Sequence, residues 1–503
     1  WNSVANLMGE HIMSEKIQSL YERIQQVRQA DGSLPEDFSL RPMAENGVRF
    51  ADGAMDGTVR YHFGPTKSPD ISALCRVLTM ASAGKFTEAS NALITHFSTG
   101  SIMLPLIDEL QAWVLDHPEE LSPEQLGRFA QAILRQSPDI ESVKFALTIL
   151  EIMDNELTAE FRETIMNLAI SEEFTLYCLF VIAGWPDADE VTFQLAQKLH
   201  GWGRIHAVSF LKPKNQAMRQ WLLAEGWKNY VLSDYSAMIC IKRGDLLAVL
   251  EQESLSRAAF ENARDIIACT LGEGPVPGMG KYKKAAELLR AYIRQAGKLA
   301  AVVEDYSSIY DVRAFIAEST LEDKDELQAD CTRLLDSEAC RTVTRQAVEE
   351  GHGLYFAKAM GLEYAEAAWN SLRRDFAENY GLIDLLLPEK LHVEEILELF
   401  ASRLPLEDMG SGPEQELGFG EEFKDYGILS YVVQTLQCLP GKGEKLIRTA
   451  LAAPVIGCRN IALNTLDAWR KADYPLSPSI QEALSSLREL EPDEKTKKRL
   501  EGF

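Results

Sequence analysis

The side chains best suited to recognition chemistry lie in two neighbouring segments, HGWGRIHAVSFLKP at 200–213 and RQWLLAEGWKN at 219–229. Indole, guanidinium and imidazole groups gather there, on Trp202, Arg204, His206, Trp221 and Trp227. Tryptophan and arginine are favoured where proteins bind partners, because they offer large contact areas and hydrogen-bond donors. The segments therefore predict a partner-binding surface. In the alternative interpretation, Gly201 and Gly203 end one helix and the indoles fill the space between helix layers.

A second candidate for partner binding is the pair Arg459 and Asn460 within ALAAPVIGCRNIALNTLDAW at 450–469. Two strongly polar side chains there interrupt an otherwise apolar helix pair. They either reach a partner or cap and bridge neighbouring helices, and the sequence leaves both roles open.

No segment carries a complete catalytic, nucleotide or metal motif. GEGPVPGMGKY at 272–282 has Pro275 where a phosphate-binding loop needs its first glycine, and Tyr282 where that loop needs serine or threonine. This segment is expected to connect two helices. The histidines never form H-E-x-x-H, and no C-x-x-C or G-x-S-x-G occurs. We therefore expect no cofactor, no metal ion and no catalytic residue.

Three patterns resemble a known family. They are GWGRIHAV, WLL-x-EG-x-x-N, and a C-terminal SPV-x-x-RN-x-AL-x-x-L-x-x-W pattern. This chain departs from the last pattern at Ala453 and at Gly457-Cys458. From about Ser68 to the end, the chain resembles uncharacterised bacterial helical-repeat proteins, largely of spore-forming lineages. Members are sometimes catalogued as limonene hydroxylase. The resemblance implies a helical-repeat fold and, as an alternative function, monoterpene hydroxylation. That reaction needs haem, flavin or a metal centre, and no cysteine lies in the F-x-x-G-x-R-x-C-x-G setting of a thiolate haem.

The elements that position these side chains are predicted to be helices. From Ser68 onward, amphipathic segments of roughly 12–18 residues alternate with short polar joints. The clearest joint predicts Ser122 as N-cap, Pro123 at the first helical position and Gln125 completing a capping box. Similar helix starts are expected at Thr158, Asp245 and Ser477. Comparable helix pairs recur over roughly 35–45 residues, which predicts an all-α, HEAT/armadillo-like α-solenoid of antiparallel helix pairs.

The N-terminal region differs from the rest. Residues 1–12 are interpreted as a non-native segment upstream of the natural start. Helical spacing of apolar residues predicts a helix from about Ser14 to Gln29. The helical period then disappears, and VRF at 48–50 with TVRYHF at 58–63 predicts a small β-hairpin or extended flap, with Gly57 helping the reversal.

Together these features divide the chain into regions. We expect an N-terminal helix with the flap over 13–67 and a helical-repeat domain over 68–404. An acidic, glycine-rich linker or loop follows at 405–425. The remaining residues, 426–503, are expected to hold further helical repeats and a charged tail.

Composition limits the possible partners. The chain has 503 residues, of which 46% are hydrophobic, and 76 acidic residues outnumber 51 basic ones to give a formal charge of -25. Such a charge repels phosphates, so we expect no nucleic-acid and no membrane partner.

The longest apolar stretch, 174–185, falls short of the roughly 20 residues of a membrane helix. The eight cysteines form no C-x-x-C pair and are interpreted as buried free thiols. With no secretory signal recognised, we expect a cytoplasmic protein.

Two functions follow as hypotheses. The first is a non-catalytic scaffold that binds a protein or peptide, basic or amphipathic, in the concave groove of a solenoid. The second is an enzyme, with limonene hydroxylation as the version that the resemblance implies.

Overall fold

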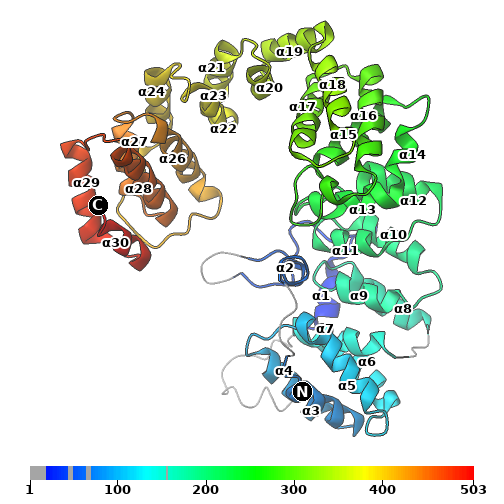
Figure 1. The fold of residues 1–503 in the computed structure, drawn as a ribbon. Coiled ribbons are helices and arrows are strands. Elements are labelled where there is room, and N and C mark those ends of the chain that lie inside the picture. The colour runs from blue at the N-terminus through cyan, green and yellow to red at the C-terminus, as the bar shows by residue number, and fades with distance from the viewer. Residues whose placement is uncertain (1–17, 44–48, 64–68, 154–156) are drawn as a thin grey trace. The chain divides into compact units, whose positions relative to one another are not determined.

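The computed structural model describes residues 18–43, 49–63, 69–153 and 157–503 (Figure 1). They form α-helices and short 3-10 or π turns, and their β-pairing is a single parallel bridge between Glu416 and Val455. The predicted all-α class is confirmed. The chain divides into two compact units, residues 1–300 with 308–332, and residues 301–307 with 333–503.

The first unit is a succession of helices joined by short connections. Their bounds are α1 Leu20–Val27, α2 Ala54–His62, α3 Ser72–Ser82, α4 Phe86–Phe97, α5 Ile107–Asp116, α6 Pro123–Gln136, α7 Ile140–Glu151, α8 Ala159–Ala169, α9 Thr175–Ile182, α10 Ala188–Lys198, α11 Trp202–Phe210, α12 Gln216–Trp221, α13 Asp234–Gly244, α14 Leu246–Leu250, α15 Arg257–Ala268 and α16 Ala285–Leu299. A π turn, η2, spans Leu222–Gly226, and η3 spans Met279–Lys281 within the predicted connection at 272–282. The division between the units falls within α17 (Val303–Glu318) and α18 (Lys324–Leu335).

These helices pack in pairs that also contact the next pair. α3 packs on α4, α6 on α7, α10 on α11, and α15 on α16. Contacts between alternate helices place α7, α9, α11 and α13 in one row (Figure 1). α1 comes first in the chain but packs between α6 and α8. The row of α7, α9, α11 and α13 is the part of the fold that carries the site described below.

Several predicted helix starts are confirmed. Ser122 and Ser477 are N-caps whose hydroxyls accept from the backbone N–H three residues on, with proline at the first helical position of α6 and of α29 (Pro478–Leu490). Thr158 caps α8 in the same manner. Asp245 precedes α14 but lies in the left-handed region at φ 57° without a side-chain cap.

The first helix begins later than predicted. α1 starts at Leu20, because Ser19 and Glu22 form a reciprocal capping box that fixes its first turn. Residues 14–17 of the predicted helix, and the proposed non-native segment 1–12, lie outside the described residues.

The predicted hairpin is wrong over its second strand. Residues 54–62 form α2, and residues 49–50 lie in coil, while Val48 lies outside the described residues. Gly53, at φ 76°, turns the chain into the helix. The Val and Tyr residues of this segment favour strands only weakly, and such preferences yield to tertiary packing, here against α11. The strand prediction therefore failed because packing against α11, and not local preference, decides the conformation of this segment.

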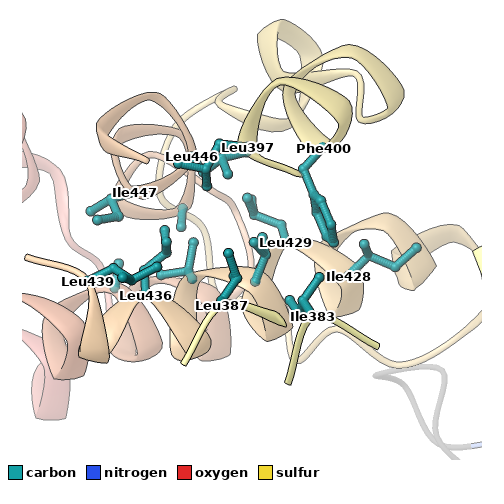
Figure 2. Close-up of a cluster of buried hydrophobic side chains, with 14 of the residues drawn as sticks. Ile383, Leu387, Leu397, Phe400, Ile428, Leu429, Leu436, Leu439, Leu446 and Ile447 are labelled. Atoms are coloured by element: carbon teal, nitrogen blue, oxygen red, sulfur yellow. The ribbon is translucent and has the colours of Figure 1, made fainter. Parts of the chain in front are cut away.

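The second unit contains α19 Glu338–Glu350, α20 Leu354–Ala359, α21 Ala365–Arg374, α22 Phe376–Asn379, α23 Ile383–Leu386, α24 Val393–Arg403, α25 Leu406–Met409, α26 Lys424–Thr435, α27 Glu444–Leu451, α28 Ile456–Lys471, α29 and α30 Glu494–Leu500. Figure 2 shows its core, where Phe400 and Leu397 of α24 meet Leu429 of α26 and Leu446 of α27. Trp469 of α28 is also buried and donates its indole N–H to the carbonyl of Leu436 at 2.9 Å. Burial of these apolar side chains is the main force that holds the helices together.

The predicted loop and tail have defined partners in this unit. Residues 410–420 are non-helical and hydrogen-bond to the segment that leads from the end of α27 into α28, with Gly412 donating to Ala452 O at 2.9 Å and Ile456 donating to Glu416 O at 3.0 Å. The charged tail contains α30, capped by Asp493.

All eight cysteines are free, and those at 178, 240, 331, 340 and 458 are buried, as predicted for most of them. None of the helices in the described ranges has the length and apolar character needed to cross a bilayer.

Candidate functional site

An extended group of polar contacts in the described part of the first unit lies where α2 covers the row of α7, α9, α11 and α13. We define the α2 contact face as the side chains that α2 touches on this row: Lys144 of α7, Tyr177 of α9, Trp202 and His206 of α11, and Tyr235 of α13. α2 thus spans four helices that the chain reaches much later in sequence.

A buried ion cluster anchors the start of α2. The ammonium group of Lys144, fully shielded from solvent, lies 2.6 Å from Asp56 of α2, 2.7 Å from Glu173 and 3.0 Å from Glu141. Tyr177 donates its hydroxyl to the other carboxylate oxygen of Asp56 at 3.0 Å. A buried charge is stable only when it is paired and hydrogen-bonded, so this arrangement depends on Asp56 being in place.

The segment before α2 adds a second link to the same cluster. Arg41 makes a two-pronged ion pair with Glu173, at 2.8 Å from Nε and 2.5 Å from Nη2. The backbone N–H of Gly53 also donates to Glu173 at 2.9 Å. A fork of this kind fixes direction as well as distance, so Arg41 and Gly53 are both oriented by the Glu173 carboxylate.

The charges in this cluster shift one another's pKa values. Burial alone would lower the pKa of Lys144, but Asp56, Glu173 and Glu141 outweigh it and raise that pKa. Burial would raise the pKa of Glu173, yet Lys144 and Arg41 hold it below its ordinary value. Burial raises the pKa of Glu141 despite the nearby ammonium. Lys144 and Glu173 are therefore ionised at neutral pH.

Glu172, next along the chain, positions α11. Its carboxylate accepts backbone N–H groups from His200 at 2.8 Å, Gly201 at 2.6 Å and Gly203 at 3.0 Å. These N–H groups belong to the start of α11, where a carboxylate is favoured by the unpaired donors and the helix dipole. Gly201 and Gly203 leave the space that this carboxylate and Thr175 occupy, since a Cβ at either position would lie within 2.6 Å of them.

Trp202 packs against α2 over two turns. Gly57 lies directly on the indole, because a Cβ there would be 2.2 Å from the ring. One turn later, Tyr61 stacks on Trp202 and on His206, with ring centroids 6.1 and 6.3 Å away. Trp202 is only 6% exposed. The indole is thus occupied by a segment of its own chain.

His206 is buried beneath Tyr61 with both ring nitrogens unpaired among the described residues. Burial, with a smaller contribution from the Arg60 guanidinium, lowers the pKa of His206 to about 3. The neutral imidazole therefore carries a hydrogen-bonding capacity that α2 does not satisfy.

The other predicted residues of this region form a second group. Arg204 is buried, donates to the carbonyls of Leu199 and Glu225, and lies 5.2 Å from the centre of the Trp221 ring. Trp227 is buried and donates its indole N–H to Leu223 O at 3.1 Å. These contacts connect α11 with α12 and η2, so their geometry matches the packing interpretation.

The predicted pair in the second unit also makes internal contacts. Arg459 is fully buried and pairs with Glu491 through both of its carboxylate oxygens, at 2.7 and 2.6 Å. Asn460 donates to Thr496 of α30 at 2.9 Å and accepts from Arg499 at 3.2 Å. Both side chains bridge segments of the chain, which is the structural role anticipated as their alternative.

The ion cluster under α2 was not predicted. Lys144 stands inside ESVKFALTIL, and a lysine within a largely apolar helical run is a signal for a buried charge that needs partners. The spacing of Asp56 and Gly57 before Tyr61 carried no comparable signal, because the segment was interpreted as a strand.

The donors expected of a thiolate-haem site do not fit. Burial raises the pKa of all eight thiols, to about 11 for Cys269 and about 12 for Cys331. A thiolate ligand needs the opposite shift. Within the described ranges, no three His, Cys, Asp or Glu side chains are grouped so that they could hold a metal ion.

Comparisons with protein-family models, with curated proteins and with solved structures give no match for this chain. The resemblance seen in the sequence, and its hydroxylase label, therefore stay predictions.

Proposed function

We propose that this chain is a non-catalytic helical-repeat scaffold of the HEAT or armadillo kind, which binds a protein or peptide partner in a concave groove. The observation that carries the proposal is that the row of α7, α9, α11 and α13 holds a helix, α2, through side chains from four helices. A surface that binds one helix with this combination of ion pair and aromatic contacts has the chemistry to bind another.

The packing of helices in pairs, with contacts between alternate helices, supports the repeat architecture. Stacked helix pairs expose a continuous row on one side, and repeat proteins use such rows for binding. The charge of -25 favours a partner segment that is basic or amphipathic, since opposite charges increase association rates.

Affinity capture with the tagged full chain tests the proposal. We expect one protein to be enriched reproducibly from native lysate and then, once purified, to bind the full chain at a defined stoichiometry by calorimetry. A tagged chain of similar charge and unrelated fold serves as the matched bait. The proposal fails if nothing is enriched over that control, or if the purified candidate does not bind.

A further inference from the structure

We infer that α2 is a displaceable internal ligand, and that the α2 contact face binds a partner helix in which an acidic residue is followed directly by glycine and, four residues later, by an aromatic residue. This inference rests on the proposed function and names the kind of partner that it requires. Asp56, Gly57 and Tyr61 supply this pattern in the chain itself.

Each residue of the pattern contacts a specific part of the α2 contact face. The carboxylate of Asp56 meets a buried ammonium and a buried phenol, from Lys144 and Tyr177. Gly57 allows the helix backbone to lie on the Trp202 indole, where any Cβ would overlap the ring. Tyr61, one turn after Gly57, packs on the contacting rings of Trp202 and Tyr235, at 6.1 and 4.9 Å from their centroids.

The link to Glu173 extends the pattern towards the N-terminal side. Arg41 supplies a guanidinium to that carboxylate, and Lys144 shares it. A partner with a basic residue ahead of its helix can make the same two-pronged contact. The face therefore favours an amphipathic helix preceded by a basic residue.

Two properties make α2 a weak occupant of the face. It has nine residues, including a glycine and the β-branched Thr58 and Val59, and so short a helix is marginal without its contacts. It also leaves both nitrogens of His206 unpaired, and an unpaired buried polar group is costly. A longer helix with a polar group over His206 would bind this face better.

A peptide added in trans tests the inference in the full chain. The probe is fluorescein-labelled ADGAMDGTVRYHF, residues 51–63, and binding is followed by fluorescence anisotropy. In the wild-type chain the tethered α2 competes at an effective concentration on the order of millimolar, so the probe binds weakly. The Gly57→Ala chain places a methyl group against Trp202 and displaces its own α2, whereas the probe keeps its glycine. We expect the probe to bind Gly57→Ala at least tenfold more tightly than wild type.

Matched controls isolate the cause. Gly427→Ala makes the same change in α26 of the other unit, where the added Cβ meets no neighbouring atom within 4 Å. This variant should bind the probe as wild type does. A probe carrying Asp56→Asn should lose at least tenfold in affinity for the Gly57→Ala chain. Tyr61→Ala, which removes contacts without adding atoms, provides a second release variant should Gly57→Ala unfold.

The inference is overturned if neither release variant binds the probe more tightly than wild type, or if both variants unfold, since α2 would then be a fixed layer of the fold. These outcomes are distinct from failure of the scaffold function. A captured partner whose affinity does not change on Gly57→Ala refutes the inference and leaves the scaffold standing. Tight probe binding without any captured partner supports a displaceable α2 and counts against the scaffold function.

Discussion

Arg459 is the residue whose removal should most disturb the second unit. Its guanidinium makes five hydrogen bonds, two to Glu491 and one each to the carbonyls of Ala453, Pro454 and Glu414. Arg459→Met keeps the bulk of the side chain but leaves the Glu491 carboxylate buried without its cation. Breaking a buried ion pair on one side costs about 3–5 kcal/mol, so we expect a loss of that size in the free energy of unfolding of this unit.

The assay follows from the position of the lost contacts. Urea unfolding followed by circular dichroism gives the stability, and hydrogen exchange with mass spectrometry assigns the loss to a segment. Exchange should accelerate at the amides of Gly412 and Ile456, because the Glu414 carbonyl held by Arg459 lies between their hydrogen bonds. The first unit should keep its exchange rates, since none of these contacts belongs to it.

The control is an arginine whose ion pair is exposed. Arg345 lies 3.3 Å from Glu338, with both side chains more than half exposed, and Arg345→Met should change stability by less than about 0.5 kcal/mol. The double variant Arg459→Met/Glu491→Leu should regain part of the loss, because no lone charge remains buried. If Arg459→Met loses less than about 1 kcal/mol, the reasoning from burial and pairing is refuted.

Three further predictions concern single residues. Since the pKa of His206 falls from its ordinary 6.5 to about 3 on folding, the unfolded chain binds the extra proton between these values, so stability should fall as the pH is lowered through this range, by up to about 1.4 kcal/mol per pH unit; urea titrations of His206→Gln should lack that slope, and an unchanged slope would contradict it. Lys144→Met should destabilise the first unit by about 3–5 kcal/mol and speed exchange in α2, because Asp56 and Glu173 stay buried without the ammonium; unchanged exchange in α2 would count against the ion cluster as its anchor. Gly427→Ala should raise the free energy of unfolding by about 0.5–1 kcal/mol, seen as a slightly higher melting temperature, since it removes a glycine from a helix with free space around it; a lower melting temperature would show that the space is not free.

The sequence predicted the helix class and many helix ends because both depend on local chemistry. Ser122, Thr158 and Ser477 cap helices by accepting from backbone N–H groups three residues away, and no distant residue is needed for that bond. The buried thiols followed equally from their apolar neighbours in sequence. In each case the deciding interaction lies within one helical turn or one apolar run.

The α2 contact face could not be predicted because its parts are far apart in the chain. Asp56 and Lys144 pair across 88 positions, and Gly57 meets Trp202 across 145, as their numbering shows. A segment such as TVRYHF has no strong local preference, so the surface that it meets decides its conformation. Periodicity reports which face of an element is apolar and says nothing of which element it will meet.

Trp202 is a buried residue and also part of the α2 contact face, because the helix that covers it comes from a distant part of the sequence. It is buried, which satisfies the packing interpretation, yet part of its cover is a short helix that contributes only Asp56 and Gly57 as buried residues of its own. An interior residue normally loses its cover only when the domain unfolds. A residue covered by a nine-residue helix loses that cover when the helix leaves, at a cost set by the Asp56–Lys144 ion pair, the Tyr177–Asp56 hydrogen bond and the ring contacts. The choice between recognition and packing at Trp202 is therefore a question about the free energy of releasing α2.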